Sequence, residues 1–148
     1  MKSFCVNRRV PFDYEIQEKL EAGLVLTGAE VKSIREGKMS LEGSFVRLLD
    51  REAWLYNAYI HPYSYSRDES YDSRKPRKLL LHRQELAKID QRIREKGLTL
   101  VPTACYNKKG KIKLEIGLGR GKKQYEKREI LKRRDIDRET ARAMRSKG

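Results

Sequence analysis

The sequence predicts a mainly β protein with flanking helices, in which short strands close into an oligonucleotide-binding-type barrel followed by a basic tail. Three observations indicate this class. Residues 111–118 alternate strictly between polar and apolar, as a strand with one buried face does. Apolar residues within 83–96 recur at helical spacing. Half of the net charge of +14 lies in residues 120–148. In so short a sheet, closure into a barrel removes the exposed edges.

The first quarter of the chain contains one strand, one predicted helix and two further short strands. Residues 3–6 read as a strand that leads into a basic step. Asp13 is a good N-cap for a helix over 14–22, because its carboxylate can accept from the first free N–H groups, and a glycine follows that helix. The apolar runs at 24–26 and 29–34 are separated by glycine and predict strands with a bend.

The middle of the chain predicts a hairpin, a loop and a third short element. Residues 44–49 and 53–60 form the two arms of the hairpin, and the aromatic content of the second arm favours a strand. Residues 63–76 are rich in Ser, Tyr, Arg, Asp and Glu without a period, which predicts a mobile loop. Residues 78–82 are compact and apolar, typical of either a strand or the start of a helix.

The next segment predicts a helix followed by a second hairpin. The helix covers 83–96 and ends at Gly97, a residue that adopts the left-handed conformation at little cost. Residues 98–106 and 111–118 then pair across a turn that contains Gly110.

The tail, residues 120–148, carries twelve Lys and Arg against five Asp and Glu. Its apolar residues form no stripe wide enough to dock on a core, yet most of its residues favour a helix. We therefore predict two parts, a barrel over 1–119 and a tail that is disordered in the free protein and helical on an anionic surface. The alternative is a solvated charged helix without a partner, but the unopposed runs 122–123 and 132–134 disfavour it.

The charge balance limits the classes of partner. Lys and Arg number 35 and Asp and Glu 21, a surplus that suits nucleic acid or an anionic membrane. The apolar runs are far shorter than the roughly 20 residues of a membrane-spanning helix, and no secretion signal precedes them. Cys5 and Cys105 lack metal-ligand spacing and indicate two free thiols in a reducing cytoplasm.

No pattern in the sequence predicts catalysis, a metal or a cofactor. His61 and His82 are the only histidines, and neither has a metal-like neighbour. The glycine-rich stretch 117–123 fails the phosphate-binding loop template, because Ile116 replaces its first glycine and Lys123 its Ser or Thr. We interpret the stretch as a phosphate clamp that exposes lysines and backbone N–H groups.

Five separated stretches carry a resemblance to a known family. They are Asn7–Arg9 with Asp13–Tyr14, Glu21–Leu24, Gly28–Ser33 with Gly37–Lys38, Arg77–His82, and Gly121–Arg128. Each stretch alone is a weak signal, but five in the right order with the right gaps are specific. On these residues the chain resembles the SmpB family of SsrA-binding proteins over essentially its whole length.

The resemblance implies a fold and a function. Family members bind the tRNA-like domain of transfer-messenger RNA (tmRNA, SsrA) and deliver it to ribosomes stalled without a stop codon, in trans-translation. It implies a barrel with flanking helices, and a tail that enters the empty mRNA channel at the decoding site as a helix. It implies no catalysis and no cofactor. We expect a monomer whose partners are tmRNA and the small-subunit rRNA of the ribosome.

The resemblance also implies two sets of site residues. Two of the tmRNA contacts carry alternatives: Leu80 is either core or an RNA contact, and Glu21 either orients a basic neighbour or accepts from a ribose 2′-OH. Tyr125 stands where other members carry His, which preserves stacking but not an imidazole proton. The tmRNA-binding set is Asn7, Arg8, Arg9, Glu21, Lys32, Leu80 and His82. The ribosome-binding set is Gly121, Lys122, Lys123, Tyr125, Lys127, Arg128, Lys132, Arg133 and Arg134.

Two other classes compete with this interpretation. A general RNA-binding or ribosomal protein with a basic tail would share the composition but would not prefer a tRNA-like RNA. An RNA-processing enzyme would use the barrel as a substrate platform, but the sequence offers it no nucleophile, base or metal cluster.

Overall fold

The computed structural model describes residues 2–146, and within them the chain forms nine strands and four helices. The strands are β1 (Lys2–Val6), β2 (Tyr14–Leu24), β3 (Met39–Ser40), β4 (Phe45–Leu49), β5 (Glu52–Tyr56), β6 (Tyr59–Ile60), β7 (Arg77–Leu80), β8 (Thr99–Lys108) and β9 (Lys111–Gly121). The helices are α1 (Val10–Asp13), α2 (Gly28–Arg35), α3 (Arg83–Lys96) and α4 (Gln124–Ser146).

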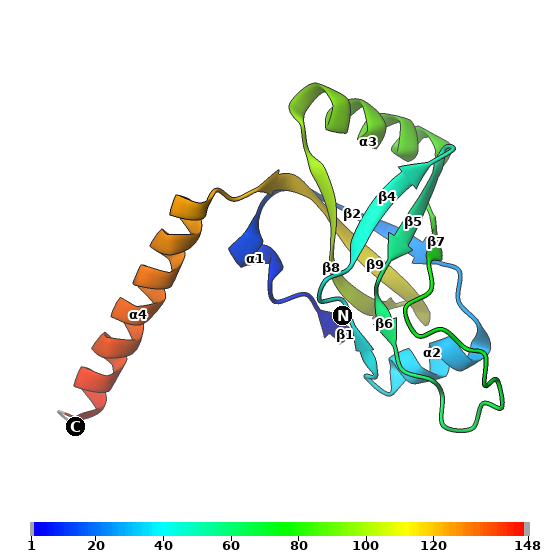
Figure 1. The fold of residues 1–148 in the computed structure, drawn as a ribbon, viewed down its shortest axis with the longest axis horizontal. Helices are drawn as coiled ribbons and strands as arrows, with labels where there is room; N and C mark the ends of the chain where they lie inside the picture. Colours follow the sequence, from blue (N-terminus) through cyan, green and yellow to red (C-terminus); the bar gives the residue numbers. More distant parts are fainter. Residues whose placement is uncertain (1, 147–148) are drawn as a thin grey trace.

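The strands build a curved antiparallel sheet. Its order in the described part of the chain is β1-β8-β9-β2-β7-β5-β4, and β3 pairs with β6 separately. Because β4 also lies against β8, the sheet curves round into a barrel, with α2 and α3 at its two ends (Figure 1). The predicted class, mainly β with flanking helices, is confirmed.

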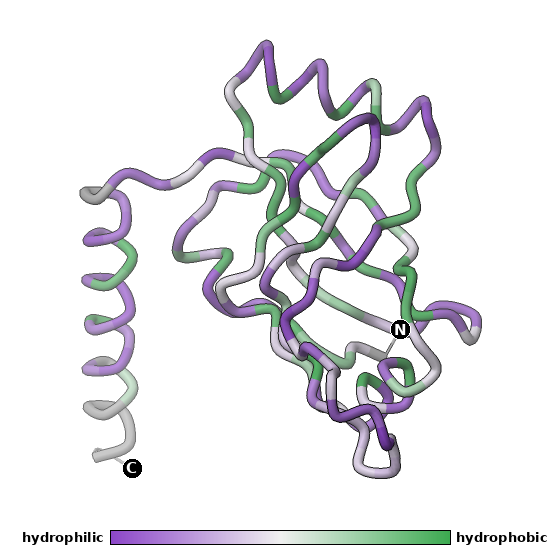
Figure 2. Tube along the Cα trace, turned by 45° about the vertical axis from the view of Figure 1, so that its right-hand side comes forward, coloured by the Kyte–Doolittle hydropathy of each residue, from purple (hydrophilic) through white to green (hydrophobic). Residues whose placement is uncertain are grey.

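Apolar side chains from the strands, α2 and α3 fill the barrel. In β9 the strict alternation predicted from the sequence places Ile112, Leu114, Ile116 and Leu118 inside. Burying one such side chain stabilises the fold by about 1.5–3 kcal/mol. In Figure 2 hydrophobic segments run through the barrel, whereas the described part of α4 is mostly hydrophilic.

Both predicted hairpins are present, and each turns on residues with positive φ. Asp50 (φ 48°) and Arg51 (φ 64°) connect β4 to β5. Lys109 (φ 51°) and Gly110 (φ 77°) connect β8 to β9. Two consecutive left-handed residues twist the chain in the sense that adjacent strands require. The predicted helix over 83–96 is also confirmed as α3 and ends on Gly97 (φ 64°).

The helix predicted over 14–22, with Asp13 as its N-cap, is wrong. These residues form β2, and Asp13 instead ends the short helix α1. The backbone of β2 pairs with β9 from Tyr14 to Gly23 and with β7 at Gly23 and Leu24. Inter-strand hydrogen bonds to segments far along the chain therefore outweigh the local helix propensity.

The strand predicted over 29–34 is also wrong, because this segment is the helix α2. Thr27 caps α2: its hydroxyl accepts from the N–H of Glu30 at 3.2 Å, and the Glu30 carboxylate accepts from the Thr27 N–H at 3.0 Å. This reciprocal pair is a capping box, and its Thr-x-x-Glu signature is visible in the sequence. Residues 24–26 lie in the end of β2 and the connection to α2.

The structure defines the secondary structure of three other segments more closely than the sequence did. The arm predicted over 53–60 divides into β5 and β6 at Asn57, whose φ is 61°. Residues 78–82, for which the sequence left strand and helix open, begin with the strand β7. Residues 63–76 form a loop without helix or strand, as predicted.

The tail leaves the barrel over two residues. β9 ends at Gly121 and α4 begins at Gln124. α4 lies beside α1 at its start and extends away from the barrel (Figure 1). The disorder that the composition predicts for this segment in the free protein stays a prediction.

Cys5 and Cys105 are free thiols on facing positions of β1 and β8. Burial raises the pKa of Cys105 to about 12, with a smaller contribution from Cys5. A thiol with so high a pKa is protonated at neutral pH, so Cys105 behaves as a small apolar residue of the core.

Candidate RNA interface

The predicted RNA-binding residues fall into three places on the molecule. The first is the basic step after β1, where Asn7 is buried. Its Nδ2 donates to the carbonyl oxygens of Pro102 (3.0 Å) and Leu41 (3.3 Å). Asn7 therefore ties the step to the barrel, and Arg8 and Arg9, which are exposed, are the residues that it presents to a ligand.

The short helix α1 connects this step to α4. Phe12 lies 5.2 Å from the guanidinium carbon of Arg9 and 5.7 Å from Nζ of Lys127, measured from its ring centre. Arg134 lies over the same ring at 5.9 Å. The Asp13 carboxylate forms ion pairs with Arg9 (3.5 Å) and Lys127 (3.3 Å). We call these five residues the α1–α4 contact, and it holds the start of the basic tail against the barrel.

The lysines between β9 and α4 differ in what they contact. The backbone N–H of Lys122 donates to the Asp13 carbonyl at 2.7 Å, and its ammonium donates to the Pro11 carbonyl at 2.6 Å. Lys123 and Gly121 are exposed. Of the two lysines predicted to clamp phosphate, Lys122 therefore fixes the joint to α1, and Lys123 is open to solvent.

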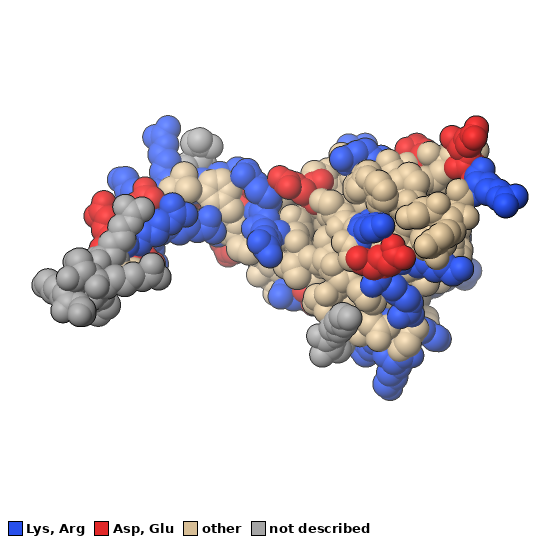
Figure 3. All heavy atoms as spheres, turned by 90° about the horizontal axis from the view of Figure 1, so that it is seen from below, with Lys and Arg blue, Asp and Glu red and all other residues tan. Residues whose placement is uncertain are grey.

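The remaining basic residues of the tail lie on α4, and their described side chains are mostly exposed to solvent. Lys132 lies 4.0 Å from Glu129 and remains exposed, and Arg128, Arg133 and Arg134 are exposed as well. The side chain of Tyr125 lies outside the described part of the structure. Figure 3 shows Lys and Arg side chains gathered along α4 and where it meets the barrel.

The second place is a groove between the start of α3, the tip of the β4–β5 hairpin and the ends of β2 and β7. It has a volume of about 1190 Å³, and Glu21, Leu80 and His82 line it together. Leu80 is 53% exposed and covers Gly23 on the neighbouring strand. Of the two alternatives for Leu80, a core position is therefore excluded, and its side chain is available to a ligand.

Glu21 is an ionised carboxylate held by two donors. The Tyr106 hydroxyl donates to it, and the Lys108 ammonium lies 3.3 Å from both of its oxygens. The hydrogen bond from Tyr106 lowers the pKa of Glu21 most, and the charges of Lys108 and Lys113 lower it further. Glu21 thus has a basic neighbour, Lys108, within reach, and the choice between orienting that neighbour and accepting from a ribose 2′-OH stays a prediction.

His82 is the N-cap residue of α3, and its backbone N–H donates to the Glu85 carboxylate at 3.2 Å. The third place is α2, where Lys32 is exposed, with its ammonium 5.3 Å from the ring centre of Tyr63. Lys32 does not line the groove. The structure therefore brings Glu21, Leu80 and His82 together and separates them from Lys32 and from the basic step.

Several basic residues of the groove were not predicted from the sequence. They come from separate segments, so no local pattern connects them, and the Tyr106 to Glu21 hydrogen bond spans 85 positions. Acidic residues alternate with them, which gives the groove donors and acceptors rather than one uniform charge. The unpredicted basic residues are Arg51, Lys78, Arg83, Arg94 and Lys113.

Neither a metal cluster nor a membrane span stands out in residues 2–146. Within that range no group of three or more His, Cys, Asp and Glu side chains could hold a metal ion. No helix there is both long and apolar enough to cross a membrane. The ring of His61 lies 2.6 Å from the Tyr59 hydroxyl, a contact that joins β6 to the loop after it.

An antiparallel barrel with exposed arginines at one end, a mixed polar groove and a projecting basic helix defines a nucleic-acid-binding protein. Comparison with known proteins specifies the family. The family model described as "SmpB protein" matches residues 4–146, and this chain belongs to that family.

Similar proteins support the assignment over nearly the full length. The "SsrA-binding protein" of Sulfurihydrogenibium sp. (strain YO3AOP1) is 49% identical over 146 residues, which cover 99% of this chain and 96% of that protein. The protein of the same description from Pelobacter propionicus is 47% identical over the same shares. A solved structure described as "tmRNA-SmpB: a journey to the center of the bacterial ribosome" is 49% identical, with a TM-score of 0.65 over 80% of this chain and 84% of that one.

Proposed function

We propose that this chain binds the tRNA-like domain of tmRNA and delivers it to stalled ribosomes, in trans-translation. The observation that carries the proposal is the family match over residues 4–146, together with relatives of 47–49% identity whose description is SsrA-binding protein. The 49%-identical structure, described as tmRNA-SmpB in the bacterial ribosome, supports both partners.

The barrel supplies the tmRNA surface in this proposal. Arg8 and Arg9 are exposed and contact phosphate, while Asn7 positions them from within the barrel. Leu80 and His82 face the groove, where an unstacked base or a ribose can bind between apolar and polar side chains. Glu21 acts through Lys108, because its carboxylate would repel phosphate directly.

The tail, 120–148, supplies the ribosomal surface, and the barrel, 1–119, is the tmRNA-binding part. The tail's exposed basic residues suit the phosphate-lined walls of an empty mRNA channel and decoding site, which α4 enters as a helix. Lys122 and the α1–α4 contact form the joint between the two parts.

The protein performs no chemistry of its own in this proposal. The relatives' description names binding rather than a reaction. The protein acts in the cytoplasm as a monomer. Its two partners there are tmRNA and the ribosome. Its role is then to hold and position an RNA, so its activity depends on its binding free energies for tmRNA and the ribosome.

Truncation after Lys123 tests the division of labour, since it leaves β9 complete. We expect affinity for the tRNA-like domain to be nearly unchanged, whereas peptide tagging on stalled ribosomes is abolished. Fluorescence anisotropy with labelled RNA and a reconstituted tagging assay measure the two quantities. A loss of RNA affinity as large as the loss of tagging would contradict the proposal.

A second experiment separates this function from general RNA binding. The intact protein should bind the tRNA-like domain far more tightly than an ordinary hairpin of equal length. The slope of log affinity against log salt should be about −0.7 per single-strand phosphate contacted. Equal affinity for both RNAs would favour the general RNA-binding or ribosomal protein.

A further inference from the structure

Two tyrosines in the loop after β6 form an aromatic pair, in which Tyr63 is half-buried and Tyr65 is exposed. Tyr65 is 82% exposed, the highest value among the exposed large hydrophobic side chains of the described residues. The rings of Tyr63 and Tyr65 lie 5.4 Å apart, centre to centre, at an interplanar angle of 61°. The N–H of Ser66 donates to the carbonyl of Tyr63 at 2.9 Å and closes the turn that presents both rings. An exposed ring of this size, held by a turn, is available to a partner.

A cation from another element completes the pair. The Lys32 ammonium, on α2, lies 5.3 Å from the ring centre of Tyr63. One ring thus has a cation beside it, while the other keeps most of its surface in solvent. Aromatic rings beside a basic side chain are the arrangement on which unpaired nucleic-acid bases stack, because every base has a π face and is joined to a phosphate.

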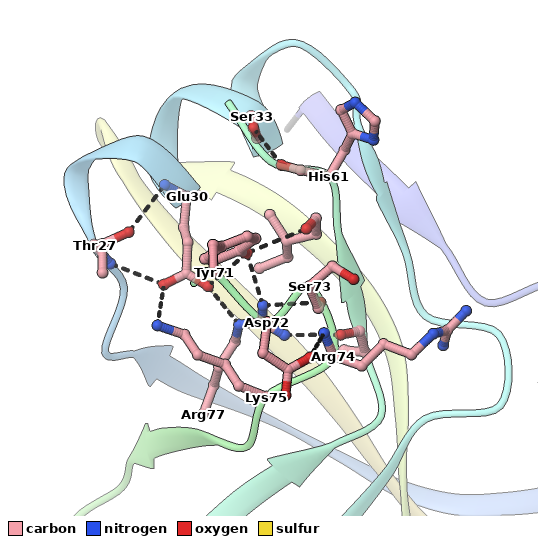
Figure 4. Close-up of polar contacts among 12 residues, drawn as sticks. Thr27, Glu30, Ser33, His61, Tyr71, Asp72, Ser73, Arg74, Lys75 and Arg77 are labelled. Carbon is pink, nitrogen blue, oxygen red and sulfur yellow. Dashed lines mark hydrogen bonds and ion pairs between the residues drawn. The ribbon is translucent and has the colours of Figure 1, made fainter. Parts of the chain in front are cut away.

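The loop is held in this arrangement by a buried network at its far end. Glu30 of α2 accepts from Nε of Arg77 at 2.7 Å and contacts the Tyr71 hydroxyl at 3.1 Å (Figure 4). Arg77 also donates to the carbonyl of Ser73 at 3.1 Å, and the Ser73 carbonyl accepts from the N–H of Ile60 at 3.0 Å. The same helix therefore carries Lys32 and anchors the loop that carries the tyrosines, so the three side chains are organised before any ligand binds.

The loop is also shaped near its tip. Asp68 accepts from the N–H and the hydroxyl of Ser70, at 3.0 and 2.6 Å. Asp72 repeats the pattern with the N–H of Arg74 at 3.0 Å. A preorganised loop loses less conformational entropy on binding than the mobile loop that the composition predicted.

We propose that Tyr65, with Tyr63 and Lys32, is a stacking platform for an unpaired base of the tRNA-like RNA. This rests on the proposed function, which supplies the RNA, and it adds a contact outside the groove and the basic step. The loop after β6 and α2, which carry the platform, lie on the opposite side of the barrel from α4, so one RNA can occupy this side while the tail stays free (Figure 1). The excess of Lys and Arg over Asp and Glu favours RNA over a protein surface as the occupant.

The test compares variants of the full-length protein with the isolated tRNA-like domain as the probe. Tyr65→Ala should weaken binding by about 5- to 150-fold, the loss that removal of one base–aromatic stack gives. Tyr65→Phe keeps the ring and should bind like the wild type. Phe45→Ala removes a partly exposed ring on β4, outside the platform, and should also leave affinity unchanged. Because Tyr65 is exposed, thermal unfolding should be the same in the wild type, Tyr65→Ala and Tyr65→Phe, and RNA affinity of Phe45→Ala is measured below its own unfolding transition.

Salt dependence adds a second readout. Tyr65→Ala should leave the salt slope unchanged, since it removes no phosphate contact, whereas Lys32→Ala should make it shallower. Wild-type affinity in Tyr65→Ala would overturn the platform. Unchanged RNA affinity with reduced tagging on ribosomes would also overturn it and would point to a ribosomal protein or rRNA as the partner. A wild-type protein that does not prefer the tRNA-like domain would instead overturn the proposed function.

Discussion

Nε of Arg77 on β7 lies 2.7 Å from a carboxylate oxygen of Glu30 on α2, and both side chains are about 98% buried. Nη1 of Arg77 also donates to the Ala58 carbonyl at 2.7 Å, and Nη2 donates to the Ser73 carbonyl, so one guanidinium joins helix α2, the connection between β5 and β6, and the end of the loop after β6. A buried pair of this kind stabilises little relative to an apolar pair, but removing one partner leaves a buried charge without compensation.

Arg77→Met should therefore destabilise the protein by about 3–5 kcal/mol, measured by urea unfolding. The neighbouring Lys78→Met is the matched control. Its ion pair with Glu52, at 3.2 Å, is exposed to solvent, so its loss should cost less than about 1 kcal/mol. Equal losses in the two variants would show that the buried network carries no special weight.

Glu30 also predicts a pH dependence of stability. Burial opposes its ionisation, but hydrogen bonds from Thr27 and Arg77 and the charges of Arg77 and Lys75 together lower its pKa below the ordinary value. The folded state therefore binds the proton more weakly than the unfolded chain. This stabilisation is fully present above the unfolded pKa of about 4.3 and is lost as pH falls through the lower, folded value.

In the wild type, the free energy of unfolding should consequently fall steeply below about pH 4.3, and Glu30→Gln should show a shallower fall. Urea midpoints measured across the acid range test this difference. Parallel curves for the two proteins would exclude Glu30 as a source of the acid sensitivity.

Gly119 allows β2 and β9 to cross closely. A Cβ at this position would lie 2.2 Å from the carbonyl oxygen of Glu15 and 3.0 Å from Cα of Ile16, both of which belong to the backbone of β2. Gly119→Ala should therefore lower the free energy of unfolding of the barrel by about 1–3 kcal/mol. Gly121→Ala, two residues on, meets nothing within 4 Å and should change stability by less than about 0.5 kcal/mol in thermal or urea unfolding.

The hydrogen bond from Tyr106 to Glu21 can be measured through the carboxyl pKa. Tyr106→Phe removes the largest cause of the lowered pKa of Glu21, so that pKa should rise toward about 4.3. An NMR titration of the side-chain carboxyl carbons reports it directly. The pKa of Glu21 should stay at its wild-type value in Tyr56→Phe, and an unshifted value in Tyr106→Phe would show that the lysines Lys108 and Lys113, not the tyrosine, lower it.

The tail should unfold separately from the barrel. The described side chains of α4 are mostly exposed, so little burial holds the helix, and the composition predicts disorder in the free protein. Circular dichroism at 222 nm should show a gradual early loss on heating, followed by the cooperative barrel transition seen by fluorescence of the single Trp54. Phe12→Ala, which removes the ring of the α1–α4 contact, should enlarge the early phase and leave the Trp54 transition unchanged. Coincident transitions by both probes would contradict a separate tail.

The candidate site was predictable only as a set of residue types. The exposed basic residues Arg8, Arg9 and Lys123 follow from local sequence, because nothing in their segments can bury them. The buried state of Asn7 does not, since its partners Leu41 and Pro102 lie 34 and 95 positions away. The position of each groove residue likewise depends on distant residues, because the groove is formed by four segments that are separate in the sequence.

The sequence by itself determined the elements whose signal is local: the β8–β9 hairpin with its strict alternation, helix α3 with its glycine stop, and the basic tail. It also carried the family resemblance, because the five stretches are contiguous motifs. Only the tertiary structure decided that residues 14–24 form a strand, that Leu80 faces solvent, and that Glu21 meets Tyr106. The physical reason is common to all three. Backbone pairing, burial and side-chain hydrogen bonds depend on residues far apart in the chain, and these interactions exceed the few tenths of a kcal/mol by which local propensities typically differ.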